Sequence, residues 1–160
     1  MFLQLIVGSF VTGVNIVIHA LLTVTTIRIA RASTSSSYPW RHLIGVMVAT
    51  VLVLMATHMA EVFVWSVAYG IVNAAPDGTD LVYFAFVNYT TLGYGDITPV
   101  ARWRLLGPMT AMNGVMLFGW STAVIFEVLR KALSQHPSFT SGVDLKASRH
   151  TGPCDPGGTM

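Results

Sequence analysis

Charged residues are scarce in this chain. Asp, Glu, Lys and Arg make up 10% of the 160 residues, hydrophobic residues make up 53%, and the mean hydropathy is +0.63. An ordinary soluble domain is richer in charge and poorer in apolar residues. The formal net charge of +2 is too small to indicate nucleic-acid binding, and the basic residues do not follow one face. The composition therefore predicts a membrane protein.

Cysteine is nearly absent, since Cys154 in the polar C-terminal segment is the only one. It has no partner for an internal disulfide, so the fold does not depend on an oxidising compartment. The chain also lacks a helix with an arginine at every third position, which excludes a voltage sensor of that kind. No internal repeat is visible. One set of membrane segments is therefore expected.

Three apolar segments are long enough to cross a bilayer, which takes about 20 residues. We expect these helices at residues 1–29, 43–72 and 105–131. A shorter apolar stretch at 79–89 cannot span, and we expect it to re-enter the membrane as a helix with Thr79 as N-cap and Asp80 in its first turn. The expected fold class is an all-α membrane protein with three transmembrane helices and a re-entrant helix.

The basic residues predict the orientation in the membrane. The linker at 30–42 and the end of the third helix are both basic, so the positive-inside rule places both in the cytoplasm and the N-terminus outside. Arg102 and Arg104 fall on the outer side and count against this orientation, but the inner ends carry more basic residues. Residues 132–160 are polar and rich in Gly, Pro and Ser, which predicts a disordered cytoplasmic tail.

Aromatic residues of the second helix fit the same orientation. Trp40 lies near its inner end, and Trp65 and Tyr69 lie toward its outer end. Tryptophan and tyrosine are enriched at both membrane interfaces. We therefore expect Trp65 and Tyr69 to form part of an aromatic belt.

Residues 90–96 read TTLGYGD, directly after the short apolar stretch and before Pro99. Glycine takes positive φ angles readily, which lets successive backbone carbonyls point to one side, and rings of such carbonyls can replace the water around a dehydrated cation. A GYGD turn also fits an ordinary loop, because Gly and Asp cluster in turns. The position between two spanning segments, behind a short helix, favours an ion pathway.

This segment resembles the selectivity filter of the potassium channel superfamily, whose pattern is T, an aliphatic residue, G, Y, G, D. The resemblance implies a pore domain over 43–131, with two transmembrane helices and a pore loop, plus one extra helix at 1–29 that it does not explain. It also implies potassium selectivity, since relatives with an acidic residue at the tyrosine position are poorly selective. The matching residues here are Thr91, Leu92, Gly93, Tyr94, Gly95 and Asp96.

By resemblance, the carbonyls of the filter and the Thr91 hydroxyl bind the dehydrated potassium ions. One chain supplies a quarter of each oxygen ring, so a single filter motif implies a homotetramer. The ion-binding residues implied are Thr91, Leu92, Gly93, Tyr94 and Gly95, with the potassium sites at the first four of them.

The residues behind the filter depart from the family's common patterns. The best-known bacterial type has an acidic residue nine positions before the post-filter Asp, and this chain has Val87 there. Where many relatives carry a tryptophan, thirteen positions before Asp96, this chain has Tyr83, whose hydroxyl can donate the same hydrogen bond to the carboxylate. We therefore assign filter support to Thr90, Tyr83 and Asp96.

The third helix supplies candidates for the inner vestibule and gate. Counting from the filter, the family's cavity-lining positions fall at Met116, Gly119, Ala123 and Glu127, and Gly114 resembles its hinge glycine. Helical spacing also places Asn113, Met116, Trp120, Ala123 and Glu127 on one face, which suggests contact with water.

Each of these candidates has a structural alternative. The pair Gly119 and Ala123, and also Gly114, have the small side chains that close helix packing uses. Four Glu127 carboxylates could concentrate cations at the inner mouth, or Glu127 could pair with Arg130 at the lipid interface. The sequence leaves both alternatives open.

Ionisable residues also occur within the second helix. His58 and Glu61 share one face, and such a pair inside a membrane segment is a functional-site hypothesis, with a mutually satisfied pair as the alternative. His19 in the first helix could complete a metal site. Counted from the inner ends of the two helices, however, His19 and His58 differ in depth by about 10 Å. This count argues against a metal site.

The sequence thus predicts a potassium channel subunit and not an enzyme, with no cofactor other than the transported potassium ions. The expected partners are three further copies of the chain and the lipid bilayer, and the expected location is the plasma membrane as a multi-pass protein. A weakly selective cation channel, or a non-conducting regulatory or assembly subunit on the same scaffold, are the alternatives.

Overall fold

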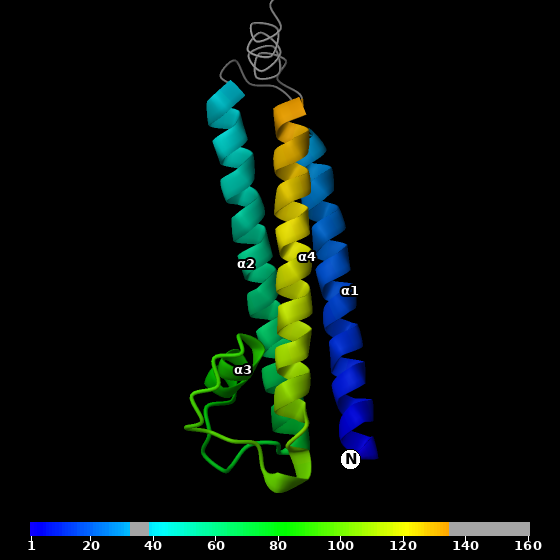
Figure 1. The fold of residues 1–160 in the computed structure, drawn as a ribbon, viewed down its shortest axis with the longest axis vertical. Helices are drawn as coiled ribbons and strands as arrows, with labels where there is room; N and C mark the ends of the chain where they lie inside the picture. The colour runs from blue at the N-terminus through cyan, green and yellow to red at the C-terminus, as the bar shows by residue number, and fades with distance from the viewer. Residues whose placement is uncertain (33–38, 135–160) are drawn as a thin grey trace, which may run out of the picture.

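The computed structural model describes residues 1–32 and 39–134, which form helices and no strand (Figure 1). Of the predicted linker 30–42, residues 33–38 lie outside the described residues, and residues 30–32 and 39–42 belong to the helices on either side. The predicted tail lies outside the described residues from residue 135 on. Three stretches are long and apolar enough to cross a membrane: Phe2–Arg28, Leu43–Val72 and Ala101–Lys131. The expected all-α class with three such helices is confirmed. The elements are α1 (Phe2–Ala32), α2 (Pro39–Val72), α3 (Leu81–Tyr89), the 3₁₀ helix η1 (Ala101–Trp103) and α4 (Leu106–Ser134).

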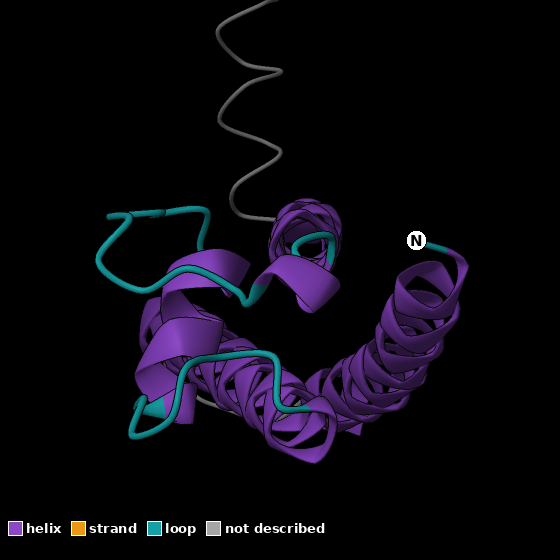
Figure 2. Ribbon diagram, turned by 90° about the horizontal axis from the view of Figure 1, so that it is seen from below, coloured by secondary structure: helices purple, strands orange, loops and turns teal. Residues whose placement is uncertain are grey.

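The long helices α1, α2 and α4 run side by side (Figure 1). Both α1 and α3 pack against α2 and α4. Figure 2, viewed along the helices, separates the N-terminal helix from the loops around α3, which lie on the other side of the bundle. The pair α2 and α4 therefore connects the extra helix to the loop that carries the filter motif.

The N-cap of the short helix α3 lies one residue later than the sequence suggested. Asp80, and not Thr79, is its N-cap, since Asp80 Oδ1 accepts hydrogen bonds from the N–H groups of Val82 at 3.0 Å and Tyr83 at 3.1 Å. Aspartate and threonine both cap helices, so the pattern alone did not separate two neighbouring candidates. The helix ends at Tyr89, immediately before the filter motif.

An aromatic core joins α2 to α3. Trp65 and Tyr69 are fully buried, with ring centroids 5.8 Å apart, and the Tyr69 ring lies 4.9 Å from that of Phe84 in α3. The expected aromatic belt at these two positions is therefore wrong: both side chains face the protein interior. Burial of the large rings against α3 removes more apolar surface from water than a place at the interface would.

Candidate functional site

The filter segment has an alternating backbone. Positive φ angles occur at Thr91 (60°), Gly93 (54°) and Gly95 (78°), and the intervening Leu92 and Tyr94 are not among the residues with positive φ. The positive φ expected at the two glycines is confirmed. Alternation of this kind turns successive carbonyls toward one side, which stacked cation sites require. A β-branched threonine at positive φ is uncommon and marks backbone strain at this position.

The start of this segment is anchored to the end of α3. The Leu92 N–H donates to the Val87 carbonyl at 3.0 Å, and the Thr91 N–H donates to the Asn88 carbonyl at 3.1 Å. The carbonyl end of a helix carries partial negative charge. The α3 helix therefore both holds the segment and directs a favourable field for cations toward its base.

The end of the segment is held by the tyrosine that the sequence singled out. The Tyr83 hydroxyl donates to Asp96 Oδ2 at 2.8 Å, so the expected hydrogen bond is present. This bond to a carboxylate raises the pKa of Tyr83, because the phenol proton is held by the negative charge. Val87, at the position of the acidic residue in the bacterial type, is buried in the apolar interior.

All side chains from Thr90 to Asp96 are exposed in the single chain. The Tyr94 side chain is 68% exposed, and Leu92 is exposed as well. Among residues 1–32 and 39–134, no segment covers the outer side of this loop. Hydrogen bonds to α3 therefore hold the backbone of the loop, while its side chains are not buried within the chain.

Helix α4 has one buried and one exposed face. The predicted vestibule residues Met116, Gly119 and Ala123 lie on the exposed face. Asn113, which helical spacing had grouped with them, does not: it is 1% exposed and accepts hydrogen bonds inside the bundle. Asn113 and Met116 are three residues apart, a spacing that places side chains near one another but not always on the same face of a helix. The buried face carries Leu106, Thr110, Asn113, Leu117, Ser121, Val124 and Val128.

Two of the open alternatives at α4 receive a structural answer. A Cβ at Gly114 would meet the Tyr89 carbonyl, so this glycine allows close approach of α4 to the end of α3. Glu127 forms ion pairs with Arg130 at 2.7 Å and with Lys131 at 2.6 Å. The pair with Arg130 is the one that the sequence offered as an alternative to a role at the inner mouth. Gly119 has open space around its Cβ direction. The geometry favours packing at Gly114 and a charge-paired Glu127.

Comparison with known proteins decides the family. The profile of a family described as ion channel matches residues 52–131, which run from α2 through α3 and the filter motif into the last turns of α4. The chain belongs to this ion channel family. The match is to the pore domain with two transmembrane helices, as the resemblance implied, and α1 lies outside it. Neither a curated protein nor a solved structure matches the chain.

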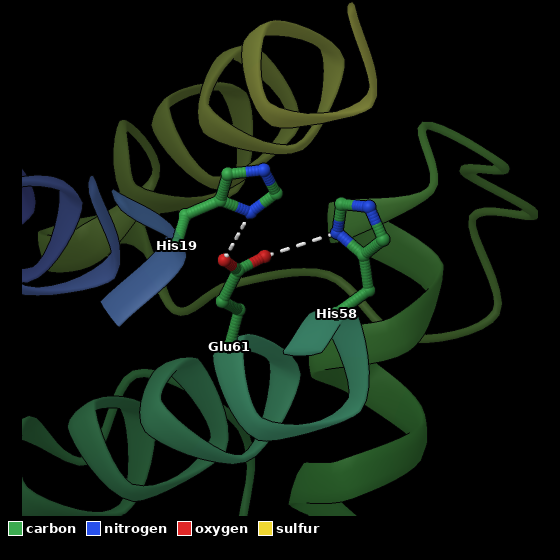
Figure 3. A group of neighbouring side chains, drawn as sticks. All are labelled: His19, His58 and Glu61. Carbon is green, nitrogen blue, oxygen red and sulfur yellow. Dashed lines mark hydrogen bonds and ion pairs between the residues drawn. The ribbon is translucent and has the colours of Figure 1, made fainter. Parts of the chain in front are cut away.

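The channel subunit is thus an integral membrane protein. It has a second site, which contains the His58 and Glu61 pair seen in the sequence and further residues that the sequence did not group with it. A buried carboxylate, Glu61 in α2, lies between two imidazoles (Figure 3). Its Oε1 is 2.9 Å from Nδ1 of His19 in α1, and its Oε2 is 3.0 Å from Nδ1 of His58. The hydroxyl of Tyr89, the last residue of α3, donates to the same Oε2. Elements α1, α2 and α3 therefore meet at one carboxylate.

The opposite edges of the two imidazoles meet at α4. Ser121 Oγ is 2.9 Å from Nε2 of His58 and 3.4 Å from Nε2 of His19. We call His19, His58, Glu61, Tyr89 and Ser121 the polar cluster. All five side chains are buried. Buried ionisable groups in a membrane segment are expensive unless they are paired and hydrogen-bonded, and these are.

A second polar contact lies beside this cluster. Asn15 of α1 donates to Asn113 Oδ1 of α4 at 2.9 Å and to the Glu61 backbone carbonyl at 3.3 Å, and the Trp65 indole N–H donates to the same Asn113 oxygen at 2.9 Å. These residues were not identified as an interhelical contact from the sequence. Polar side chains that bond across helices are a common way for membrane helices to associate.

The depth argument against His19 meeting His58 is wrong. Their ring centroids are 5.4 Å apart. The argument counted residues from the inner ends of α1 and α2 and assumed that these ends lie at the same depth. In the structure, the start of α2 extends beyond the end of α1, on the side of the bundle away from α3 (Figure 1). The extra length of α2 compensates for the difference in count, and the two histidines lie at the same depth. The mutually satisfied pair, which was the alternative for His58 and Glu61, is present as part of a larger network that includes His19 of α1.

Proposed function

We propose that the channel subunit conducts potassium passively through a central filter formed by four copies of the chain. The observation that carries this proposal is the TLGYG backbone with positive φ at alternate residues, anchored to α3 at one end and to Tyr83 at the other. Stacked carbonyl sites of this kind replace the hydration shell of potassium. The ligands are the carbonyls of Thr91, Leu92, Gly93 and Tyr94 with the Thr91 hydroxyl, and Gly95 completes the loop.

A fourfold assembly is the second part of the proposal. The exposed apolar face of α4, with Met112, Val115 and Met116, could face lipid, but the irregular backbone of the exposed filter loop could not, because its polar groups would lack partners in the hydrocarbon region. Packing of four copies around an axis would bury the loop and would place the exposed face of α4 along the axis. Met116, Gly119 and Ala123 would then line the inner vestibule, with Glu127 near its mouth.

Flux through the purified full-length chain in liposomes tests the conduction proposal. A reversal potential that follows the potassium gradient and ignores sodium is expected. A potential that also follows sodium would favour a weakly selective cation channel, and absence of flux from a correctly assembled protein would favour a non-conducting subunit. The mass of the complex in detergent, measured by light scattering, tests the four copies independently.

The proposed orientation has the N-terminus outside and the C-terminus in the cytoplasm of the plasma membrane, with no cofactor needed for conduction. Basic residues at the 30–42 linker and at Arg130 and Lys131 support it. In a Cys154→Ser background, a cysteine introduced by Ser35→Cys should resist an impermeant thiol reagent added outside cells and react after permeabilisation. Labelling from outside without permeabilisation would reverse the orientation.

A further inference from the structure

The polar cluster contains the ligand types of a transition-metal site. His19, His58 and Glu61 each offer one ligand atom, and these atoms all lie within 4.8 Å of one another. The side chains of His19 and Glu61 are 0% exposed and that of His58 is 7% exposed. Two imidazole nitrogens and one carboxylate oxygen form a common protein ligand set for zinc, which takes a fourth ligand from water or another group.

The number of hydrogen-bond donors in the cluster also favours a bound cation. A neutral imidazole has one N–H and one lone pair. If both rings donate from Nδ1 to Glu61, both Nε2 lone pairs face Ser121, whose hydroxyl has a single hydrogen. One buried nitrogen is then left without a donor, a situation that folded proteins generally avoid. A further positive charge, either a proton on one imidazole or a metal ion, removes this conflict.

A metal ion beside the carboxylate resolves the conflict directly. Both Nδ1 lone pairs then bind the ion, and both rings carry their hydrogen on Nε2. The Ser121 oxygen has two lone pairs and can accept from both rings, at the observed 2.9 Å and 3.4 Å. A ligating histidine typically donates its other N–H to such an oxygen, which fixes the tautomer and the ring orientation. Ser121 occupies this place for two histidines at once.

We propose that His19, His58 and Glu61 bind a divalent transition-metal ion of the zinc class. The ligands are Nδ1 of each imidazole and a carboxylate oxygen of Glu61. Nδ1 of His19 lies 2.9 Å from Oε1 and Nδ1 of His58 lies 3.0 Å from Oε2, a few tenths of an ångström below the spacing of about 3.3 Å between ligands in a tetrahedral site with bonds near 2.0 Å. Because these are different oxygens of Glu61, the carboxylate must rotate to present one oxygen to an ion held by both imidazoles, or must ligate through both oxygens.

The site gives the extra helix a defined role. The ion would bind α1 through His19 to α2 through His58 and Glu61. Glu61 in turn accepts from Tyr89, the last residue of α3, and Thr90 follows it at the start of the filter motif. A change in metal occupancy would therefore act on the base of the filter. This last step rests on the proposed function, whereas metal binding does not. The sequence predicted no cofactor, and the proposal revises that expectation.

Zinc content of the full-length chain tests the proposal. The parent protein for the test should replace the other potential ligands, with His42→Ala, His136→Ala, His150→Ala and Cys154→Ser, and should carry no histidine tag. After equilibration with zinc and gel filtration, elemental analysis is expected to give one zinc per chain. Competition with a chromophoric chelator then gives the affinity. Neither measurement depends on ion flux, so failure of the metal site and failure of the channel function are distinguishable.

Three variants sharpen the test. Glu61→Gln should lose the ion, and Ser121→Ala should weaken binding about 10–100-fold, as removal of a partner of ligating histidines does. Glu127→Gln, which removes a carboxylate on the exposed side of α4, should keep one zinc per chain. Folded parent protein without zinc, or equal zinc in the Glu61→Gln and Glu127→Gln proteins, would overturn the proposal. The parent measurement decides the question even where a variant does not fold.

Discussion

The filter loop and the polar cluster differ in how one chain stabilises them. The loop is exposed from Thr90 to Asp96 and is held by bonds at its two ends. The cluster is enclosed within one chain and draws its side chains from all four α-helices. In the proposed fourfold assembly, other copies of the chain would complete the surroundings of the loop, whereas the cluster is enclosed within a single chain.

The two carboxylates in these regions show the same difference. Asp96 is exposed and accepts one side-chain hydrogen bond, from Tyr83. Glu61 is buried and has three side-chain partners. An exposed charge can exchange its partner for water, whereas a buried charge that loses its partners remains unsolvated. Changes at the loop should therefore alter conduction and leave the fold intact, and changes at the cluster should alter the fold itself.

The largest effect on conduction is expected from Gly93→Ala. A Cβ at Gly93 has space, with only the Thr91 carbonyl at 3.9 Å, but the φ of 54° strains any residue other than glycine. Potassium flux should be abolished and the detergent mass unchanged. Gly13→Ala is the matched control, because Gly13 lies in α1 with nothing within 4 Å of its Cβ direction. Flux like that of the wild type from Gly93→Ala would refute the assignment of the filter.

The largest effect on stability is expected from Glu61→Ala. Without the carboxylate, His19, His58 and Tyr89 lose a shared partner, and removal of one side of a buried ion pair lowers the free energy of unfolding by about 3–5 kcal/mol. Unfolding in detergent, with a chelator present, measures it. Glu127→Ala is the control, because exposed ion pairs contribute little. Equal stability of the two variants would contradict the contrast between the regions.

The backbone of the filter motif could be predicted from the sequence because its conformation depends on consecutive residues. Local rules give the positive φ of the glycines, and the count from Asp96 to Tyr83 crosses only one short helix, where errors in spacing stay small. The membrane segments were equally accessible, because length and hydropathy define them. These parts of the molecule depend on local sequence, and the sequence described them well.

The polar cluster could not be predicted in this way. The residues of the cluster lie far apart in the chain: His19, Glu61, Tyr89 and Ser121. Their contacts depend on the axial offset between α1 and α2. Residue counts from helix ends do not give that offset, which is set by the packing of whole helices. A signal was present, since polar residues at Asn15 and His19 are one helical turn apart in an otherwise apolar segment. That spacing could have marked one face of α1 as buried.

A smaller loss of stability is expected where the two regions touch. Gly114→Ala places a Cβ against the Tyr89 carbonyl, so α4 must move away from the end of α3. Overpacking of this kind typically lowers the free energy of unfolding by about 1–3 kcal/mol. Gly45→Ala in α2, where no atom lies within 4 Å of the Cβ direction, is the control and should be neutral or slightly stabilising. Unfolding in detergent compares them, and a Gly114→Ala protein as stable as the control would show that this contact is not tight.

The smallest change tests the support at the outer end of the filter. Tyr83→Phe removes one oxygen and nearly no volume, and it leaves Asp96 without its side-chain donor. Because the carboxylate is exposed, water can replace that donor, so the mass in detergent and the thermal stability should stay unchanged. The loop end becomes freer to move, and we expect faster decay of the potassium current or a lower preference for potassium over sodium.

Electrical recording in bilayers, with the two cations on opposite sides, measures both properties in one experiment. Phe84→Leu is the matched control, since Phe84 is buried beside Tyr83 and contributes packing but no hydrogen bond. That variant should lower the stability and leave the decay of the current unaltered. Tyr83→Phe currents with the selectivity and the decay of the wild type would mean that the hydrogen bond to Asp96 contributes nothing to conduction.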